Sequence, residues 1–140
     1  MKQFTLKTYS SSTAIEQNCF FILNKGLNSG KPFPQPFCNS FKFIAENEVE
    51  RDVFYWITFA AWQGKLFYPY HKGSVIPFIT IIDTIEVIKN ATKNCIANPE
   101  RITQLVQTFD TLNKLEVKYN SLTKLTKIAK RAAALNFIKA

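Results

Sequence analysis

The sequence has few of the residues on which catalytic and metal sites depend. It holds a single histidine, His71, and three cysteines that are far apart, Cys19, Cys38 and Cys95. A zinc site needs closely spaced cysteine or histidine ligands, and a catalytic triad needs a histidine with nucleophilic and acidic partners. Neither pattern is present near these residues, so we expect no metal, no cofactor and no enzymatic activity.

The sequence also lacks a long hydrophobic run. The longest mostly apolar stretch, residues 53–62, is about half of what a membrane-spanning helix needs. Met1 is followed by polar residues and not by the apolar segment of a secretory signal. The odd number of cysteines favours a reducing compartment. These features predict a cytoplasmic protein without a membrane partner.

Acidic residues are scarce: 10 carboxylates stand against 18 Lys and Arg side chains, which gives a formal net charge of +8. The excess is larger in residues 100–140 than in the rest of the chain. A basic surface attracts nucleic acid, anionic lipid or an acidic protein, although lysines also keep exposed helix faces soluble. Most of the cations are lysines, which favours contact with a nucleic-acid backbone over readout of bases by arginine.

The pattern of apolar residues predicts an α+β fold. Short strands are expected at residues 2–9, 19–23 and 39–44. A mostly buried aromatic helix should begin after Asn47, a capping residue, and end at Gly64. A second helix should begin at the Thr80-x-x-Asp83 capping pattern and end near residue 90, with residues 90–98 connecting it to the next element. We expect a small mixed sheet packed by the aromatic helix, in a compact head of residues 1–97.

Residues 98–140 are predicted to form a long amphipathic helix. Asn98 is a suitable cap, Pro99 suits the first helical position, and no glycine or second proline follows. A helix this long cannot bury its apolar side along its whole length against a small head. We expect it to pair with itself in a second copy or with a helical protein partner through a heptad seam that includes Leu105, Leu112, Leu115, Tyr119 and Leu122.

Two segments are candidates for ligand binding. Residues 26–31 hold two glycines and a lysine, which suggests either a phosphate cradle or, more simply, a tight turn, because the P-loop spacing is absent. Residues 65–74 interleave cations with aromatics, a combination that can neutralise phosphates and stack on bases, unless the aromatics fold back into the core. The predicted DNA-binding residues are Lys31, Lys42, Lys65, Tyr68, Tyr70, Lys72 and Ser74.

Three segments together resemble the second half of a target recognition domain from a type I restriction specificity subunit. They are residues 21–44, residues 52–79 and the Pro99-Glu100 step that opens the long helix. In that family such a helix sets the spacing between two recognition domains. The chain departs from the family pattern in two ways. Asn98-Pro99 stands where the family usually has two prolines before the helix, and the first half of a full domain is missing or compressed into residues 1–20. The most distinctive run of the resemblance is Gly73-Ser74-Val75-Ile76-Pro77-Phe78-Ile79.

The resemblance and the charge favour a non-enzymatic module that binds duplex DNA and pairs through its last helix. The chain is also similar to small proteins of unassigned function from phages and mobile elements of gut bacteria. That similarity supports an alternative, a structural or inhibitory protein that binds protein and uses its helix for assembly. A third hypothesis is a fragment that mimics a specificity subunit and so poisons restriction. Under all three hypotheses we expect the protein to be in the cytoplasm of a bacterial host or, if it is phage-encoded, in a virion.

Overall fold

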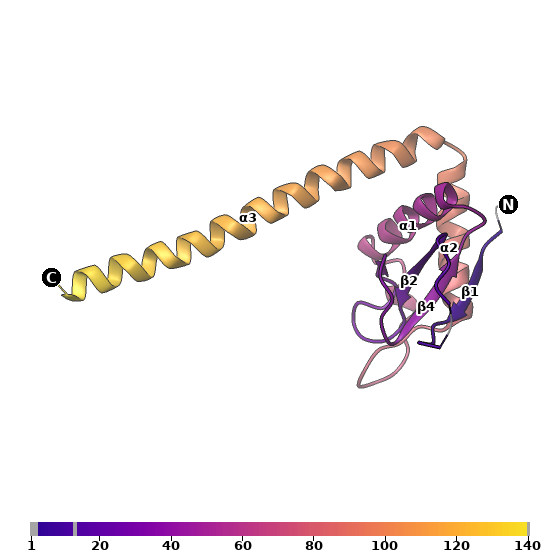
Figure 1. Ribbon diagram of the computed structural model, residues 1–140, viewed down its shortest axis with the longest axis horizontal. Coiled ribbons are helices and arrows are strands. Elements are labelled where there is room, and N and C mark those ends of the chain that lie inside the picture. The colour runs from indigo at the N-terminus through magenta and orange to yellow at the C-terminus, as the bar shows by residue number, and fades with distance from the viewer. Residues whose placement is uncertain (1–2, 13, 140) are drawn as a thin grey trace. The chain divides into compact units, whose positions relative to one another are not determined.

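A computed structural model describes residues 3–12 and 14–139, and it shows the expected α+β fold (Figure 1). Four strands form one sheet in the order β1-β4-β2-β3. All three pairings are antiparallel, so the prediction of a mixed sheet was wrong. The connections between the strands contain no helix, and a parallel pair would need a crossover of a dozen or more residues. The strands are β1 (Thr5–Thr8), β2 (Cys19–Leu23), β3 (Pro32–Phe33) and β4 (Ser40–Ile44).

Two helices pack against each other and against one face of the sheet. Helix α1 (Glu48–Gln63) contacts β2 and β3, and α2 (Ile81–Ile96) contacts β1. Alternate strand residues point to the same face, so every second side chain of β2 and β4 enters this layer. The ring of Phe43 stacks on Phe20 at 4.5 Å between centroids and also packs against Phe54 of α1. Six phenylalanines are buried in the head: Phe20, Phe21, Phe41, Phe43, Phe54 and Phe67.

The predicted helix starts are confirmed by their caps. The side chain of Asn47 accepts a hydrogen bond from the Glu50 amide at 2.9 Å, and Thr80 accepts one from the Asp83 amide at 3.2 Å. The end of α2 was predicted too early, because the helix continues to Ile96. Thr92 is buried on its inner side and donates its hydroxyl to the Ile88 carbonyl at 2.7 Å. The polar residues of this turn are thus compatible with helix.

Helix α3 (Pro99–Lys139) is continuous for 41 residues, as predicted. Contacts divide the chain into a first unit of residues 1–102 and a second unit of residues 103–140, so α3 begins within the first unit. The described part of the second unit is the remainder of α3, and no described residue of α3 is buried. Among the described helices, none is both long and apolar enough to cross a membrane.

Candidate functional site

The two candidate segments lie side by side in the head, although about 40 residues separate them in the sequence. The amide of Gly26 donates to the Pro77 carbonyl at 2.6 Å, and the Ile79 amide donates to Asn24 at 3.0 Å. Phe78 forms isolated bridges with Lys25 on one side and Lys72 on the other. We call residues 24–31 and 65–78 the basic loop cluster. Its longer loop projects from the end of the head in Figure 1.

Residues 26–31 form a tight turn and not a phosphate cradle. The amides of Ser29, Gly30 and Lys31 donate to backbone carbonyls of the chain at 2.7–3.1 Å, as the amide of Gly26 does to Pro77. A phosphate cradle needs such amides free to face the ligand. Gly30 has φ +99, and a Cβ there would lie 2.4 Å from the ring of Phe67. The turn is therefore built against the second loop, which explains its glycine.

Cations and aromatics meet where this turn approaches the end of α1. The Lys31 Nζ lies 4.9 Å from the ring centre of Trp62 and 5.1 Å from that of Phe33. Lys65 follows Gly64 with a positive φ of 59 and is exposed. A surface pocket of about 280 Å³ lies here between the two loops. Its lining includes Trp62, Lys65, Tyr68 and His71, together with Leu27, Asn28, Ser29, Gln63 and Phe67.

Two of the predicted contacts are partly engaged within the protein. The Lys72 Nζ pairs with the Asp83 carboxylate at 2.8 Å, and this hydrogen bond holds the pKa of Asp83 below its usual value. The Tyr70 hydroxyl donates to Glu86 at 3.3 Å, and the negative charge of Glu86 raises the pKa of Tyr70. Tyr70 is therefore tied toward α2, whereas Tyr68 and Ser74 are exposed.

Lys42 does not belong to this surface, so its prediction as a DNA contact is withdrawn. It lies in β4 on the sheet face opposite the helices, and its exposed fraction is 5%. The Nζ donates to the Glu16 carboxylate at 2.8 Å and to the Ala14 carbonyl at 3.1 Å. The hydrogen bond with Lys42 lowers the pKa of Glu16. A buried ammonium needs such partners, and these leave it no access to a phosphate.

The basic loop cluster itself contains no carboxylate, although Asp83 and Glu86 of α2 contact its Lys72 and Tyr70. Residues 17–45 and residues 53–82 contain no Asp or Glu, and four carboxylates stand together in residues 46–52. Glu46 precedes α1, and Glu48, Glu50 and Asp52 lie in its first half, whereas the loop cluster adjoins its end. Lys25 and Trp62 were missed by the sequence prediction. The bridge between Lys25 and Phe78, and the place of Trp62 under Lys31, depend on contacts between distant segments.

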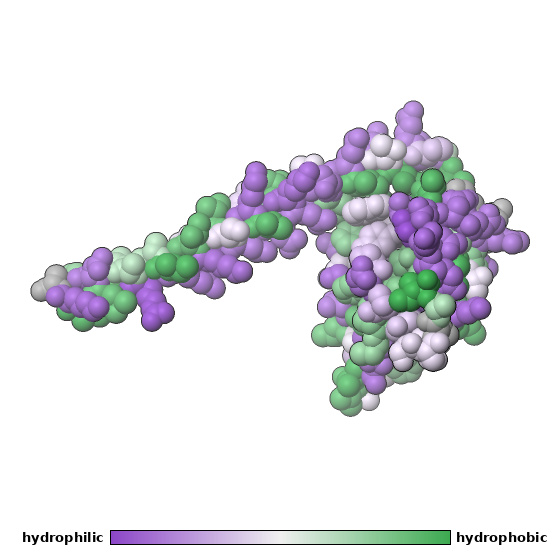
Figure 2. Space-filling view, viewed as in Figure 1, coloured by the Kyte–Doolittle hydropathy of each residue, from purple (hydrophilic) through white to green (hydrophobic). Residues whose placement is uncertain are grey.

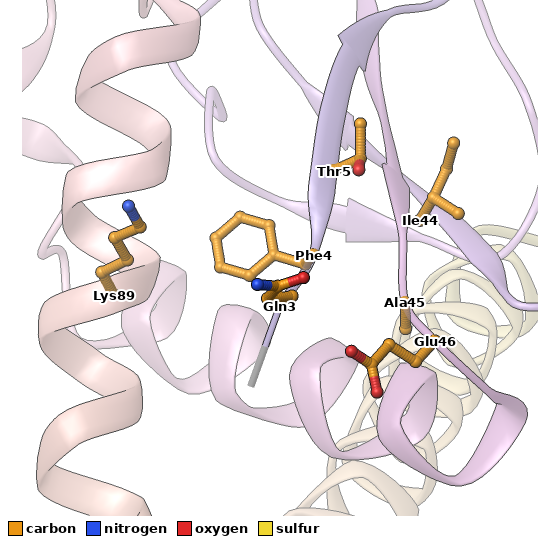
Figure 3. A pocket seen from close by; sticks show the side chains of 7 residues that line it. All are labelled: Gln3, Phe4, Thr5, Ile44, Ala45, Glu46 and Lys89. Atoms are coloured by element: carbon orange, nitrogen blue, oxygen red, sulfur yellow. The ribbon is translucent and has the colours of Figure 1, made fainter. Parts of the chain in front are cut away.

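A larger pocket, of about 470 Å³, lies elsewhere in the head (Figure 3). Lys89 reaches it from α2, and Glu46 borders it where β4 ends. Phe4, Ile44 and Ala45 supply apolar walls. Within residues 3–12 and 14–139, no group of three His, Cys, Asp or Glu side chains is placed to hold a metal ion.

The predicted pairing residues lie along α3 in the second unit. Leu105 is half-buried, whereas Leu112, Leu115, Tyr119 and Leu122 are exposed. Their spacing of three, four or seven residues keeps them on one side of a helix. In proteins, most of the stability of a helix comes from packing of its apolar face and not from intrinsic helix propensity. The seam is thus available to a second helix, and its use stays a prediction.

Comparisons with known proteins place the chain in a family but supply no function. No curated protein and no solved structure matches it. A family model described as "Family of unknown function (DUF6943)" matches residues 6–136, which covers most of the head and nearly all of α3. The resemblance to a restriction specificity subunit therefore stays a prediction. Because the match extends over nearly the whole sequence, the chain belongs to the DUF6943 family of unknown function.

Proposed function

We propose that this protein is a non-enzymatic DNA-binding module. The basic loop cluster contacts the phosphate backbone of duplex DNA, and α3 pairs with a second helix. The observation that carries the proposal is the meeting of two segments that contain lysines and no carboxylates. Lys25, Lys31, Lys65 and Lys72 all belong to the basic loop cluster, and the rings of Trp62 and Phe33 lie beside Lys31.

The physical basis is counterion release. Each lysine that neutralises a phosphate frees a condensed cation, so affinity falls as salt concentration rises. Lys31 and Trp62 together present a positive charge over an aromatic face, and exposed Tyr68 adds a ring that can lie against a sugar or base. The scarcity of arginine favours contact with the backbone over readout of base sequence.

The test is a titration of labelled duplex DNA, followed by fluorescence anisotropy at about 50 and about 200 mM salt. The triple variant Lys31→Gln/Lys65→Gln/Lys72→Gln should bind more weakly than the wild type. The slope of log affinity against log salt should also become shallower by about two to three, roughly one per lost phosphate contact. Wild-type protein that fails to bind any duplex at about 50 mM salt would remove the proposal.

A matched control removes the same charge from another part of the head. Lys7, Lys89 and Lys93 are exposed and lie outside the basic loop cluster, on β1 and α2. Their triple replacement by Gln should leave the salt slope nearly unchanged. Equal weakening by both triple variants would show that only net charge matters, and the loop cluster would lose its assigned role.

One observation favours the alternative function, binding of a protein. Leu27, Val75 and Ile76 are exposed apolar residues of the same loop cluster, and such surfaces often mark protein contacts. If the protein sediments as a helix-paired oligomer whose behaviour is indifferent to duplex DNA, this alternative replaces DNA binding. Capture of restriction methyltransferase subunits by tagged protein would support the mimic of a specificity subunit instead.

A further inference from the structure

We propose that the tip of the loop at residues 73–77 acts as an apolar wedge that inserts between stacked base pairs and bends the duplex. The wedge residues are Val75 and Ile76. The inference rests on the proposed DNA binding and adds to it a second mode of contact, which depends on apolar insertion and not on charge.

The two wedge residues are consecutive and exposed. The exposed fraction is 89% for Val75 and 53% for Ile76. Figure 2 shows apolar surface at the tip of this loop, which projects from the body of the head. A single exposed aliphatic residue is ordinary, but two in succession at the end of a projecting loop, with exposed Leu27 on the adjoining turn, form an apolar tip.

The base of the loop is closed by backbone hydrogen bonds, which limits the freedom of the tip. Lys72 and Phe78 exchange two backbone hydrogen bonds, each of 2.9 Å, and Lys25 pairs with the other side of Phe78. Gly73 has φ +92, and a Cβ there would lie 2.8 Å from the Ile76 carbonyl oxygen. A preorganised tip loses little conformational entropy when it inserts, which favours a wedge over a loose loop.

Lysines at the base of the loop provide the charge that a wedge needs. Lys72 and Lys25 flank Phe78 on its two sides, and no carboxylate belongs to residues 53–82. Two anions of α2 lie near the base: Asp83 pairs with Lys72, and Glu86 accepts a hydrogen bond from Tyr70. Phosphate contacts hold a protein in register on the duplex, and apolar side chains then unstack a base step and kink the helix by about 20–90°.

The experiment compares the wild type with Val75→Ser/Ile76→Ser on a duplex of about 25 base pairs labelled at both ends, read by energy transfer. The wild type should shorten the distance between the ends, and the variant should lose this bend. Its affinity should fall at least about 10-fold, because two buried aliphatic contacts are lost. Its salt slope should stay unchanged, since no phosphate contact is removed.

Two controls separate the wedge from other effects. Ile15→Ser/Val49→Ser removes exposed aliphatic side chains outside the loop cluster and should change neither the bend nor the affinity. The second control measures binding of the wild type and the tip variant to vesicles that contain phosphatidylserine, because an apolar tip with lysines could also insert into an anionic bilayer. Loss of vesicle binding in the tip variant, with DNA binding intact, would overturn the wedge.

The failure of the wedge and the failure of DNA binding give different results. If the wild type binds DNA and the tip variant bends it equally well, the wedge is wrong and the proposed function survives. If the wild type binds no duplex, both are wrong.

Discussion

At the scale of single residues, Gly26 and Gly30 have the same backbone angle but different surroundings. Both have φ +99, yet a Cβ on Gly26 would meet open space, whereas one on Gly30 would lie 2.4 Å from Phe67. We expect Gly30→Ala to lower the free energy of unfolding by about 2–5 kcal/mol, from backbone strain plus the clash. Gly26→Ala should cost only the strain, about 1–2 kcal/mol. Urea denaturation of both variants measures the difference, and equal losses would show that Phe67 moves aside freely.

The pair formed by Lys42 and Glu16 predicts a pH dependence of stability. The hydrogen bond from Lys42 lowers the pKa of Glu16 in the folded protein, so this carboxylate stabilises the fold when it is ionised. The contribution is present above the unfolded pKa, about 4.3, and is lost as pH falls through the lower folded pKa.

This dependence is measurable as a difference between two proteins. Glu16→Gln should be less stable than the wild type at pH 7, because Lys42 loses the negative charge of its partner and keeps only neutral acceptors. The gap in the free energy of unfolding should narrow between about pH 5 and pH 2, where the wild type loses its ion pair. A gap that is constant with pH would show that the charge of Glu16 contributes nothing.

At the scale of elements, the start of α1 depends on a single side chain. The Asn47 oxygen accepts the Glu50 amide, which would otherwise lack a partner at the end of the helix. Asn47→Ala should lower the free energy of unfolding by about 1 kcal/mol. Asn47→Asp keeps the acceptor and should change it by only a few tenths of a kcal/mol. Thermal unfolding followed by circular dichroism tests the pair, and indistinguishable variants would contradict the role of the cap.

Local signals of this kind explain which elements could be read from the sequence. Asn47, Thr80 and Pro99 mark the starts of three helices, because capping and the missing proline amide act within one turn. The end of α2 could not be read in this way. Its last turns are polar on the outside, and only packing of Thr92 against the core identifies them as helix.

At the scale of the whole molecule, the charge along α3 predicts how two copies pair. Residues 103–116 carry one lysine and two carboxylates, whereas residues 117–140 carry six cations and no acidic side chain. A parallel pair would place the two basic halves together, which is unfavourable within a Debye length. An antiparallel pair sets the basic half of each helix beside the less basic half of the other and also opposes the helix dipoles. We therefore expect α3 to pair antiparallel.

Disulfide trapping tests the orientation. Leu112 and Ile128, like Leu115 and Leu125, are symmetric about residue 120, so an antiparallel pair centred there brings Leu115 level with Leu125 of the other copy. In a Cys38→Ser background, a mixture of Leu115→Cys and Leu125→Cys chains should cross-link to each other. Each variant alone should not, because ten residues of helix separate the thiols by about 15 Å. The reverse result would show parallel pairing, and a monomer at every concentration would remove pairing itself.

The sequence by itself determined the fold class, the helix starts, the unbroken length of α3 and the basic character of the chain, since these depend on local periodicity, caps and composition. Only the tertiary structure decided that Lys42 is buried beside Glu16 and that two lysine-containing loops about 40 residues apart lie side by side. Strand pairing and side-chain burial depend on which distant segments meet. Which distant segments pair depends on how well the whole core packs. A short stretch of sequence does not contain that information.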